Sequence, residues 1–484
     1  MNWGDDGREL LDYAAKLYGS PTRTIKNIQF YFRDGLTWST LSSAGMTMRY
    51  SPSGFISETK GAVCFFDSEN EKLKTLAVLN SNIVDPLILT MSPTLDFHEG
   101  PVGLIPINRN IDESVISLSE ECVAIAKDDW DSKETSWDFK RHQLSSYQGA
   151  VEVAIKDILD RARDKTGRVK ECEERINEIV INSYGLNKEI SPYVSASAIT
   201  LDNNIHFAYS SILEETDKVK AYISDLFAGF ISYSIGVMFG RYSLDVNGLV
   251  YAHSGNVGFS DLVKEGKYET FPVDDDGIIP LTDQEWFPDD ATNRFRDFVN
   301  VVWGEYHLQE NLDFVADSLC LHAIKPKKSE SSIDTIRRYL STQFYKDHLK
   351  TYKKRPIYWL FSSGKQKAFE CLVYLHRYNE GTLARMRTEY VIPLTAKMAA
   401  YAQKLENDKE ASGSAAEVKR LEKEIAQLHK QQAELSEFDE KLRHYADQRI
   451  SLDLDDGVKA NYGKFGDLLA EVKAITGEAP EALS

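Results

Sequence analysis

Two pairs of residues have a spacing that a DNA-cleaving site could use, an acid followed two positions later by a lysine. They are Glu58 with Lys60 and Glu265 with Lys267. Hydrolysis of a phosphodiester by a metal-held water is the chemistry that such carboxylates could support. A chain with 75 acidic and 57 basic residues contains such pairs by chance. A self-contained nuclease is therefore a hypothesis without specific support.

Other catalytic and binding motifs are incomplete or missing in the sequence. The segment SSGKQK at Ser362 lacks a glycine five positions before Gly364, so it is not a phosphate-binding loop. No G-x-S-x-G or H-E-x-x-H pattern occurs. The segment DDDG at Asp274 to Gly277 lacks the alternating acids and the final glutamate of a calcium loop. We predict no catalytic, cofactor-binding or metal-ligating residue in this chain.

Positive charge is concentrated in one segment. Residues Lys325 to Tyr390 contain fifteen Lys or Arg and six Asp or Glu, whereas the whole chain has a formal net charge of −18. Phosphate affinity comes from clustered Lys and Arg, so the overall charge argues against indiscriminate nucleic-acid binding. A basic segment inside an acidic chain favours selective placement of a polyanion. The alternative is a solvated helix face with lysines at exposed positions.

The elements that must position these residues follow from the hydrophobic pattern. Alternation in Phe30 to Leu41 and in Met46 to Ser57 predicts strands near the amino terminus, and helical patterns prevail after Glu113. Apolar residues at helical spacing after Leu394 and after Val418 predict two long helices, separated by the break EASGSAAE at Glu410 to Glu417. Two such helices form an antiparallel hairpin.

We therefore predict an α+β chain that has a β-rich domain followed by mainly helical domains and an antiparallel helical hairpin. The expected domains are a β-rich domain at 1–145, a helical spacer domain with an acidic loop at 146–290, a basic helical domain at 291–390, the helical hairpin at 391–450 and a carboxy-terminal tail at 451–484.

Cysteine usage and hydropathy predict the cellular compartment. The five cysteines are an odd number and form no C-x-x-C pair, which favours reduced thiols over a disulfide framework or a zinc site. The longest apolar candidate, Leu226 to Phe239, is shorter than the roughly eighteen residues of a membrane span. We expect a cytoplasmic protein that does not contact the membrane.

Several longer motifs carry a family resemblance. They are TWSTLSSAGMTMRYSPSGFI at Thr37 to Ile56, AVLNSNIVDPLILTMSPTLDFHEGPVGLIPI at Ala77 to Ile107, DDWDSKETSWDFKRHQL at Asp128 to Leu144, MFGRYSLD at Met238 to Asp245, FYKDHLKTYKKRPIYWLFSSGKQKAF at Phe344 to Phe369 and LDLDDGVKANYGKF at Leu452 to Phe465. Together they resemble the adenine-specific DNA methyltransferases of BREX phage exclusion, the PglX family, and the motif at Ala77 to Ile107 is similar to a pattern that combined methyltransferase and restriction enzymes share more widely. The resemblance extends from about Trp3 to about Val472.

This sequence departs from the family in one respect. The family carries an amino-terminal Rossmann-like domain with an N-P-P-Y type motif for the target adenine and a glycine motif for S-adenosylmethionine, and this sequence contains neither. The resemblance implies a carboxy-terminal target-recognition part that binds no cofactor itself, with S-adenosylmethionine belonging to the missing domain. The implied partners are double-stranded DNA, that methyltransferase domain in cis or trans, and other BREX proteins or phage inhibitors.

Two sets of side chains are candidates for binding DNA within such a module. The first set is Thr37, Ser39, Thr40, Ser42, Ser43 and Arg49, and the second is Arg337, Arg338, Lys346, Lys350, Lys353, Lys354 and Arg355. Bases are read in the grooves by polar side chains, whereas phosphates are held by cations. The spacing of Lys350, Lys353 and Lys354 predicts one helical face that follows the phosphates. Tyr358, Trp359 and Phe361 are expected in the core.

Alternative interpretations stay open for both sets and for the whole chain. The hydroxyl side chains could be ordinary strand and turn residues. The chain could also be a protein-interaction scaffold that docks other BREX components through its helical hairpin and acidic surface.

Overall fold

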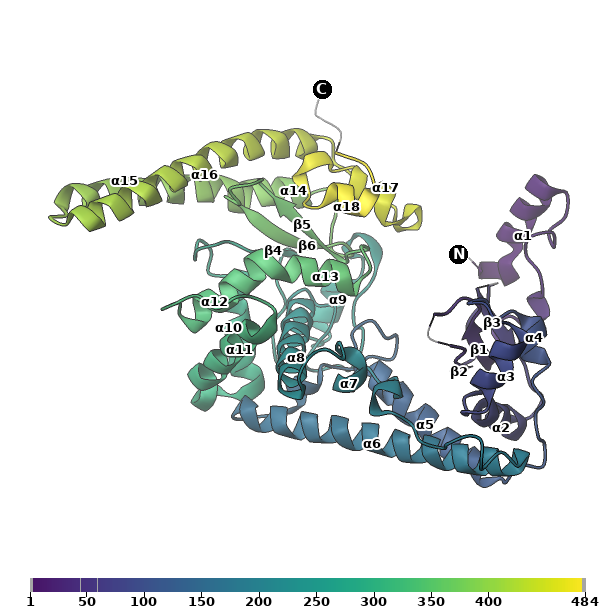
Figure 1. The fold of residues 1–484 in the computed structure, drawn as a ribbon. Helices are drawn as coiled ribbons and strands as arrows, with labels where there is room; N and C mark the ends of the chain where they lie inside the picture. The colour runs from purple at the N-terminus through teal and green to yellow at the C-terminus, as the bar shows by residue number, and fades with distance from the viewer. Residues whose placement is uncertain (1–2, 44, 59, 481–484) are drawn as a thin grey trace. The chain divides into compact units, whose positions relative to one another are not determined.

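The computed structural model describes residues 3–43, 45–58 and 60–480, which divide into two compact units (Figure 1). Unit 1 is Met1–Asp129 with Arg161–Ala208, and unit 2 is Trp130–Asp160 with Tyr209–Ser484. Helix α6 (Val151–Tyr184) contributes residues to both units. The five consecutive domains expected from the sequence stay predictions, because compact units are a coarser division than domains.

A small antiparallel sheet lies in unit 1, with its strands in the order β2–β1–β3. The strands are β1 (Gly35–Ser39), β2 (Arg49–Ser51) and β3 (Gly61–Cys64). Along β1, Leu36 and Trp38 are buried whereas Thr37 and Ser39 keep exposed surface. This is the period-two alternation of a strand with one face in the core.

Helices form most of the rest of unit 1. They are α1 (Gly4–Tyr18), α2 (Glu69–Leu79), α3 (Val84–Met91), α4 (Glu99–Gly103), α5 (Ser114–Asp131), the later part of α6, and α7 (Ile205–Ala208). The α+β class is confirmed in its coarse form, but the prediction of a β-rich domain is wrong. The alternation in Phe30 to Leu41 produces only a five-residue strand, because Ile28–Phe30 forms a 3₁₀ turn before it.

The core of unit 2 surrounds one long apolar helix, α8 (Glu215–Met238). By length and composition α8 could cross a membrane, but 72% of its apolar window is buried inside the protein. It packs against α10 (Ala291–Trp303) and α11 (Leu308–His322), with the rings of Phe230 and Trp303 stacked at 4.6 Å. We therefore interpret α8 as the central core helix of this unit.

Unit 2 contains a second antiparallel sheet, which the sequence analysis did not predict. Its order is β4–β6–β5, with β4 at Ile278–Pro280, β5 at Tyr358–Ser362 and β6 at Glu370–Tyr374. Every residue of β6 is buried, so the strands show no alternation that would distinguish them from helix. As predicted, Tyr358, Trp359 and Phe361 lie in the core.

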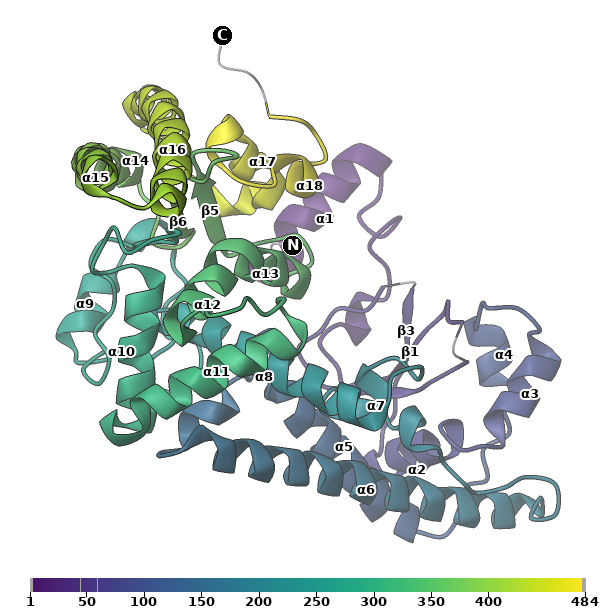
Figure 2. The ribbon, with the colours of Figure 1, turned by 60° about the vertical axis from the view of Figure 1, so that its left-hand side comes forward.

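Short helices surround this sheet. Both ribbon views show α17 (Gly457–Gly463) and α18 (Val472–Thr476) beside β5 (Figures 1 and 2), and Ala470 donates its backbone N–H to the carbonyl of Leu360 at 2.9 Å. Before β5 the chain forms α12 (Ser332–Tyr339), a π-helical turn and α13 (Tyr345–Thr351). Two further short α-helices in the described part of the unit are α9 (Phe259–Lys264) and α14 (Thr382–Arg385).

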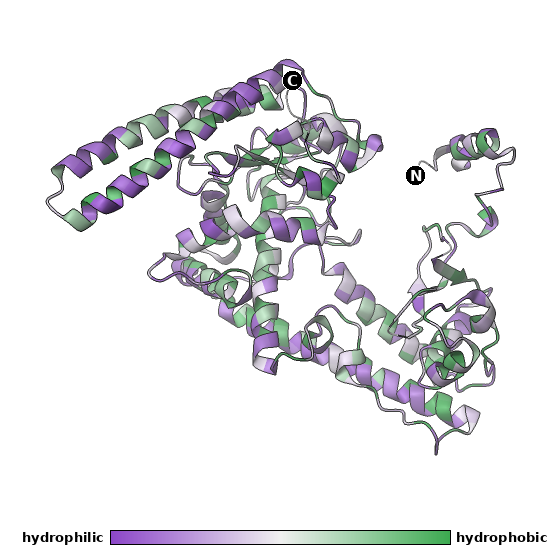
Figure 3. Ribbon diagram, turned by 45° about the horizontal axis from the view of Figure 1, so that its top comes forward, coloured by the Kyte–Doolittle hydropathy of each residue, from purple (hydrophilic) through white to green (hydrophobic). Residues whose placement is uncertain are grey.

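The two expected hairpin helices are present as α15 (Ile392–Ala411) and α16 (Ala415–Asp447), which pack along one another (Figures 1 and 2). Hydrophobic and hydrophilic residues alternate along both helices (Figure 3), in keeping with one buried seam on each. The carboxy-terminal half of α16 also contributes to the core around the unit 2 sheet, because Leu435, Phe438 and Leu442 are buried in one cluster with Phe361 and Phe369.

Candidate nucleic-acid interface

Many cations of the basic segment are engaged inside the protein. Arg337 is buried and forms an ion pair with Asp290, and Arg338 forms two hydrogen bonds to Glu330 through Nε and Nη2, at 2.9 and 2.6 Å. Arg377 is buried, with its guanidinium group 3.9 Å from the centre of the Phe259 ring. Ion pairs also engage Lys327, Lys367, Arg385 and Arg387. The net charge of the basic segment is therefore larger than the positive charge that it exposes to solvent.

Five of the predicted cations remain exposed and clustered in sequence. They are Lys346, Lys350, Lys353, Lys354 and Arg355. Among the described residues, no carboxylate lies within ion-pair distance of any of the five. We call Lys350 to Arg355 the basic turn, and Lys346 lies one helical turn before Lys350 on the same face of α13. Unpaired cations in such a run are available to an external anion.

The predicted single helical face is wrong for this run, because α13 ends at Thr351. Lys353 and Lys354 both have left-handed backbone conformations, with φ of 50° and 61°. Their N–H groups donate to the carbonyls of Lys350 and Leu349 at 3.2 and 2.7 Å, which closes the helix end. A residue with a Cβ rarely adopts this conformation, so the surrounding structure must hold it.

His348 holds the two ends of the basic turn together. Its Nε2 accepts hydrogen bonds from the backbone N–H groups of Ile357 and Tyr358 at 3.1 and 3.2 Å. The neutral ring therefore carries its proton on Nδ1. The ring is buried, and the loss of hydration together with the charge of Arg241 lowers the pKa of His348 to about 3. The end of α13 and the start of β5 are thereby connected through one neutral side chain.

Tyr352, inside the basic turn, is held by a second contact. Its hydroxyl donates to Oε1 of Glu134 at 2.7 Å, and the Ser232 hydroxyl donates to the same oxygen at 3.0 Å. Removal of the Glu134 carboxyl group from water raises its pKa, and this effect is partly offset by the two hydroxyl donors and by the charge of Arg241. The turn is therefore anchored to a part of the chain more than 200 residues earlier.

The cluster around Glu134 extends to Arg241. The Arg241 Nε donates to the Tyr242 hydroxyl at 3.1 Å, and its Nη1 donates to the Tyr374 hydroxyl at 3.4 Å. Close packing leaves no room for a side chain at Gly236 on α8, where a Cβ would lie 2.6 Å from the Tyr242 ring and 2.9 Å from the Tyr358 hydroxyl. Three of the sequence motifs thus meet at this cluster: 128–144, 238–245 and 344–369.

The hydroxyl residues predicted in unit 1 differ in their exposure. Ser39 and Ser43 are exposed and Ser42 is partly buried. Thr37 is also partly buried and donates to the carbonyl of Ala62 at 2.9 Å. Thr40 is 1% exposed, and its Oγ1 has no hydrogen-bond partner among the described residues. A base edge therefore has access to some members of this set but not to Thr40.

Arg49 is exposed at the start of β2, although its guanidinium group already makes local contacts. Its Nη2 donates to the Thr200 hydroxyl and its Nη1 to the carbonyl of Met48, each at 3.1 Å. These bonds leave other N–H donors of the guanidinium group free for a base or phosphate.

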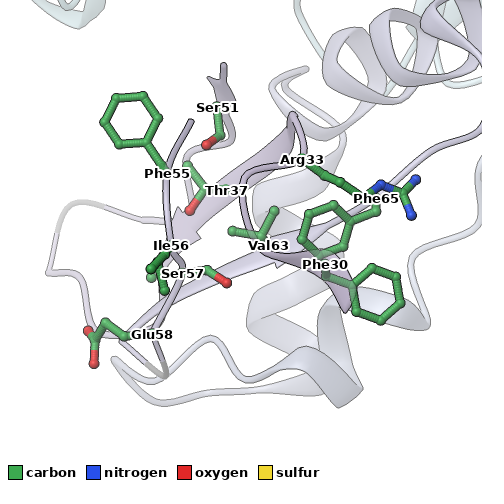
Figure 4. Close-up of a pocket in the computed structure, with 11 residues that line it drawn as sticks. Phe30, Arg33, Thr37, Ser51, Phe55, Ile56, Ser57, Glu58, Val63 and Phe65 are labelled. Carbon is green, nitrogen blue, oxygen red and sulfur yellow. The ribbon is translucent and has the colours of Figure 1, made fainter. Parts of the chain in front are cut away.

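A hollow of about 240 Å³ lies against the exposed face of the unit 1 sheet (Figure 4). Thr37, Val63 and Ile56 lie at its centre and Phe55 at one side. The rings of Phe30 and Phe65 stack at 4.9 Å, with the Arg33 guanidinium group 5.6 Å from each ring centre. The lining is mixed, so it does not define one ligand by itself.

Metal binding has no support in the described parts of the chain, where no three His, Cys, Asp or Glu side chains converge on a common point. The DDDG segment instead forms a turn, in which Asp274 Oδ2 accepts from the N–H groups of Asp276, Gly277 and Ile278 at 3.2, 2.6 and 3.2 Å. Arg377 also donates to the backbone carbonyl of Asp274 at 2.6 Å, so the Asp274 carboxylate and this carbonyl are both engaged within the protein.

Sequence comparison identifies relatives of the chain, although no family model matches it. It is 48% identical over 485 residues to the adenine-specific methyltransferase BrxX of Escherichia coli O9:H4 (strain HS), an alignment that covers 100% of this chain and 39% of that protein. It is 36% identical over 485 residues to the adenine-specific methyltransferase PglX of Lacticaseibacillus casei (strain Zhang), with 98% and 38% covered.

The chain is thus similar along its whole length to adenine-specific methyltransferases. The resemblance stated from its motifs is confirmed: it matches a part of the BrxX and PglX proteins. The chain spans about two fifths of the length of these relatives.

Proposed function

We propose that this chain is the DNA target-recognition portion of a BREX-type adenine-specific methyltransferase. It binds duplex DNA and positions one adenine for a methyltransferase domain outside this sequence, in the cytoplasm and in defence against phage. S-adenosylmethionine is bound by that other domain. The similarity to BrxX and PglX supports the family context of the proposal.

The observation that carries the proposal is the basic turn. In a segment where most arginines are already paired, Lys346, Lys350, Lys353, Lys354 and Arg355 are exposed and unpaired among the described residues. Cations in this state release counterions from DNA when they bind phosphates, which gives affinity without sequence preference. We assign these five residues to phosphate contact and leave out Arg337 and Arg338, whose guanidinium groups are engaged.

Sequence reading requires other residues, because phosphate contacts position a duplex and base contacts specify it. The exposed members of the unit 1 set, Ser39, Ser43 and Arg49, have donors and acceptors suited to base edges. Thr37 and Ser42 are partly buried and contribute where the DNA approaches closely. An adenine methyltransferase extrudes its target base, so a separate module must hold the flanking duplex.

The proposal is tested by binding and by methyl transfer. We expect the purified chain to bind a fluorescein-labelled 30-base-pair duplex, with log affinity falling linearly against log salt concentration. With labelled S-adenosylmethionine it should transfer no methyl group alone, and adenine methylation should appear when a methyltransferase domain from a relative is added. Absence of salt-dependent binding, or methyl transfer by the chain alone, would contradict the proposal.

The scaffold hypothesis predicts a different result in the same assays. A module that only docks proteins would show no salt-dependent affinity for the duplex. Leu435, Phe438 and Leu442 of α16 are buried with the sheet residues Phe361 and Phe369, so a docking surface on the hairpin would use the exposed side chains near its tip, within residues 407–420.

A further inference from the structure

The basic turn is fixed at both of its flanks and in its middle. His348 joins the end of α13 to the start of β5 through its two backbone contacts. Between these points, Tyr352 is directly followed by Lys353 and Lys354, and its hydroxyl reaches Glu134 at 2.7 Å. Tyr352 is partly buried whereas the three cations after it are exposed. The turn therefore has a fixed inner side and a solvent-facing cationic side.

Two further observations indicate that stability alone does not explain this arrangement. Two consecutive lysines occupy left-handed conformations that a Cβ disfavours. A carboxyl group is also withdrawn from water to receive the Tyr352 hydroxyl, and burial raises the pKa of Glu134. Both features oppose stability, because a left-handed residue with a Cβ is strained and a buried carboxyl group loses its hydration.

We infer that the Glu134–Tyr352 hydrogen bond preorganises the basic turn for phosphate contact, with both side chains acting as positioning residues that do not touch DNA. This inference rests on the proposed function. An unanchored loop loses conformational freedom when it binds, and that loss opposes binding. A loop already held in its binding conformation avoids most of that loss.

The number of phosphate contacts sets the salt slope, whereas the conformational freedom lost on binding changes the affinity at every salt concentration. Tyr352→Phe removes the hydroxyl and no cation, so the slope of log affinity against log salt should stay the same. Affinity at any one salt concentration should fall about fivefold, the size expected for ordering one or two additional side chains on binding. A purely structural role would instead lower the melting temperature and leave the affinity of the folded protein unchanged.

Tyr345→Phe, at the start of α13, is a matched control. Tyr345 is buried, and its hydroxyl pairs with the Tyr462 hydroxyl at 2.8 Å rather than with Glu134. Both variants lose one tyrosine hydroxyl from unit 2. We expect Tyr345→Phe to bind duplex DNA like the parent chain. Equal weakening in both variants would show a general loss of packing and would overturn the inference.

A second pair of variants tests the other partner. Glu134→Gln keeps an oxygen that accepts from Tyr352, so its affinity should stay close to that of the parent chain. Glu134→Leu removes the acceptor and should weaken binding about fivefold. Equal weakening in both variants would overturn the inference, because both remove the carboxylate charge and only Glu134→Leu also removes the acceptor.

Trypsin offers a readout that does not depend on DNA. Cleavage after Lys353 and Lys354, followed by mass spectrometry under native conditions, should accelerate several-fold in Tyr352→Phe and not in Tyr345→Phe, because a loosened turn is cut faster. Unchanged cleavage together with unchanged affinity in Tyr352→Phe would refute the inference while leaving the proposed function intact. If the parent chain does not bind duplex DNA, the proposed function fails and the positioning role with it.

Discussion

Replacing Lys350, Lys353 and Lys354 with alanine should change how salt affects DNA binding. If each of the five unpaired cations neutralises one phosphate of B-DNA, the slope of log affinity against log salt is about −4.5. Three substitutions leave Lys346 and Arg355 and a slope of about −1.8. Between 50 and 200 mM salt, the parent chain would then lose roughly 500-fold in affinity and the variant roughly 12-fold.

The folded state should tolerate this triple substitution. All three side chains are exposed, and surface changes usually alter the free energy of unfolding by about half a kcal/mol. Alanine also has a Cβ, so the left-handed strain at residues 353 and 354 is not changed. A melting curve recorded in each salt buffer checks that affinity is measured on folded protein.

The control removes the same charge from another surface of the same unit. Lys419, Lys423 and Lys430 are exposed on α16, and changing them to alanine also removes three positive charges from a chain whose formal net charge is −18. Fluorescence anisotropy at five salt concentrations gives the slope of each protein. Equal slopes for the parent chain and the basic-turn variant, or an equal change in the control, would refute the phosphate assignment.

Three further predictions concern the packing and hydrogen bonds of unit 2. The pKa of His348 in the folded protein is about 3, against an ordinary 6.5. As the pH falls, the ring is therefore protonated in the unfolded chain before it is protonated in the folded protein. The contribution of His348 to stability should therefore be complete above pH 6.5 and be lost between about pH 6.5 and 3, and thermal melts of His348→Gln should show a flatter pH dependence than the parent chain. Gly236→Ala should destabilise unit 2 by about 1–3 kcal/mol in urea unfolding, because its Cβ would overlap the Tyr242 ring, although alanine usually stabilises a helix; a stabilised variant would contradict the tight packing. Glu434→Ala should lower the free energy of unfolding by about 1–3 kcal/mol in the same assay, because the carboxylate accepts from the N–H groups of Gln366 and Ala368 at 2.7 and 3.2 Å. Replacing residues 404–421 at the hairpin tip by a short linker should lower it much less.

The hairpin was predictable because its signal is local. Leu421, Ile425 and Leu428 repeat at helical spacing, and all three are buried as this spacing predicts. The sheet of unit 2 was not predictable in the same way. In YWLFS and ECLVY both faces are buried, so the pattern contains neither the alternation of a half-exposed strand nor a helical period.

The residue types of the candidate site could be predicted from the sequence, but which of these side chains are exposed could not. Arg337 and Lys350 are equivalent in a count of charge, yet Arg337 is buried against Asp290, 47 positions earlier in the chain, whereas Lys350 is exposed. The anchoring residues were missed because a glutamate and a tyrosine separated by 218 positions have no local pattern that connects them. The one available signal was that Glu134 and Tyr352 both lie within family motifs.

The placement of the cations also reconciles an acidic chain with a DNA partner. At physiological salt the Debye length is about 8 Å, so a phosphate senses the charges close to it rather than the net charge of −18. The excess of acids over bases in the rest of the chain opposes contact in other orientations, because like charges repel within that distance. A short run of unpaired cations in a fixed turn can therefore select one orientation of the duplex. Sequence reading by other residues requires this orientation, since base edges are recognised only when the groove is in register with the side chains.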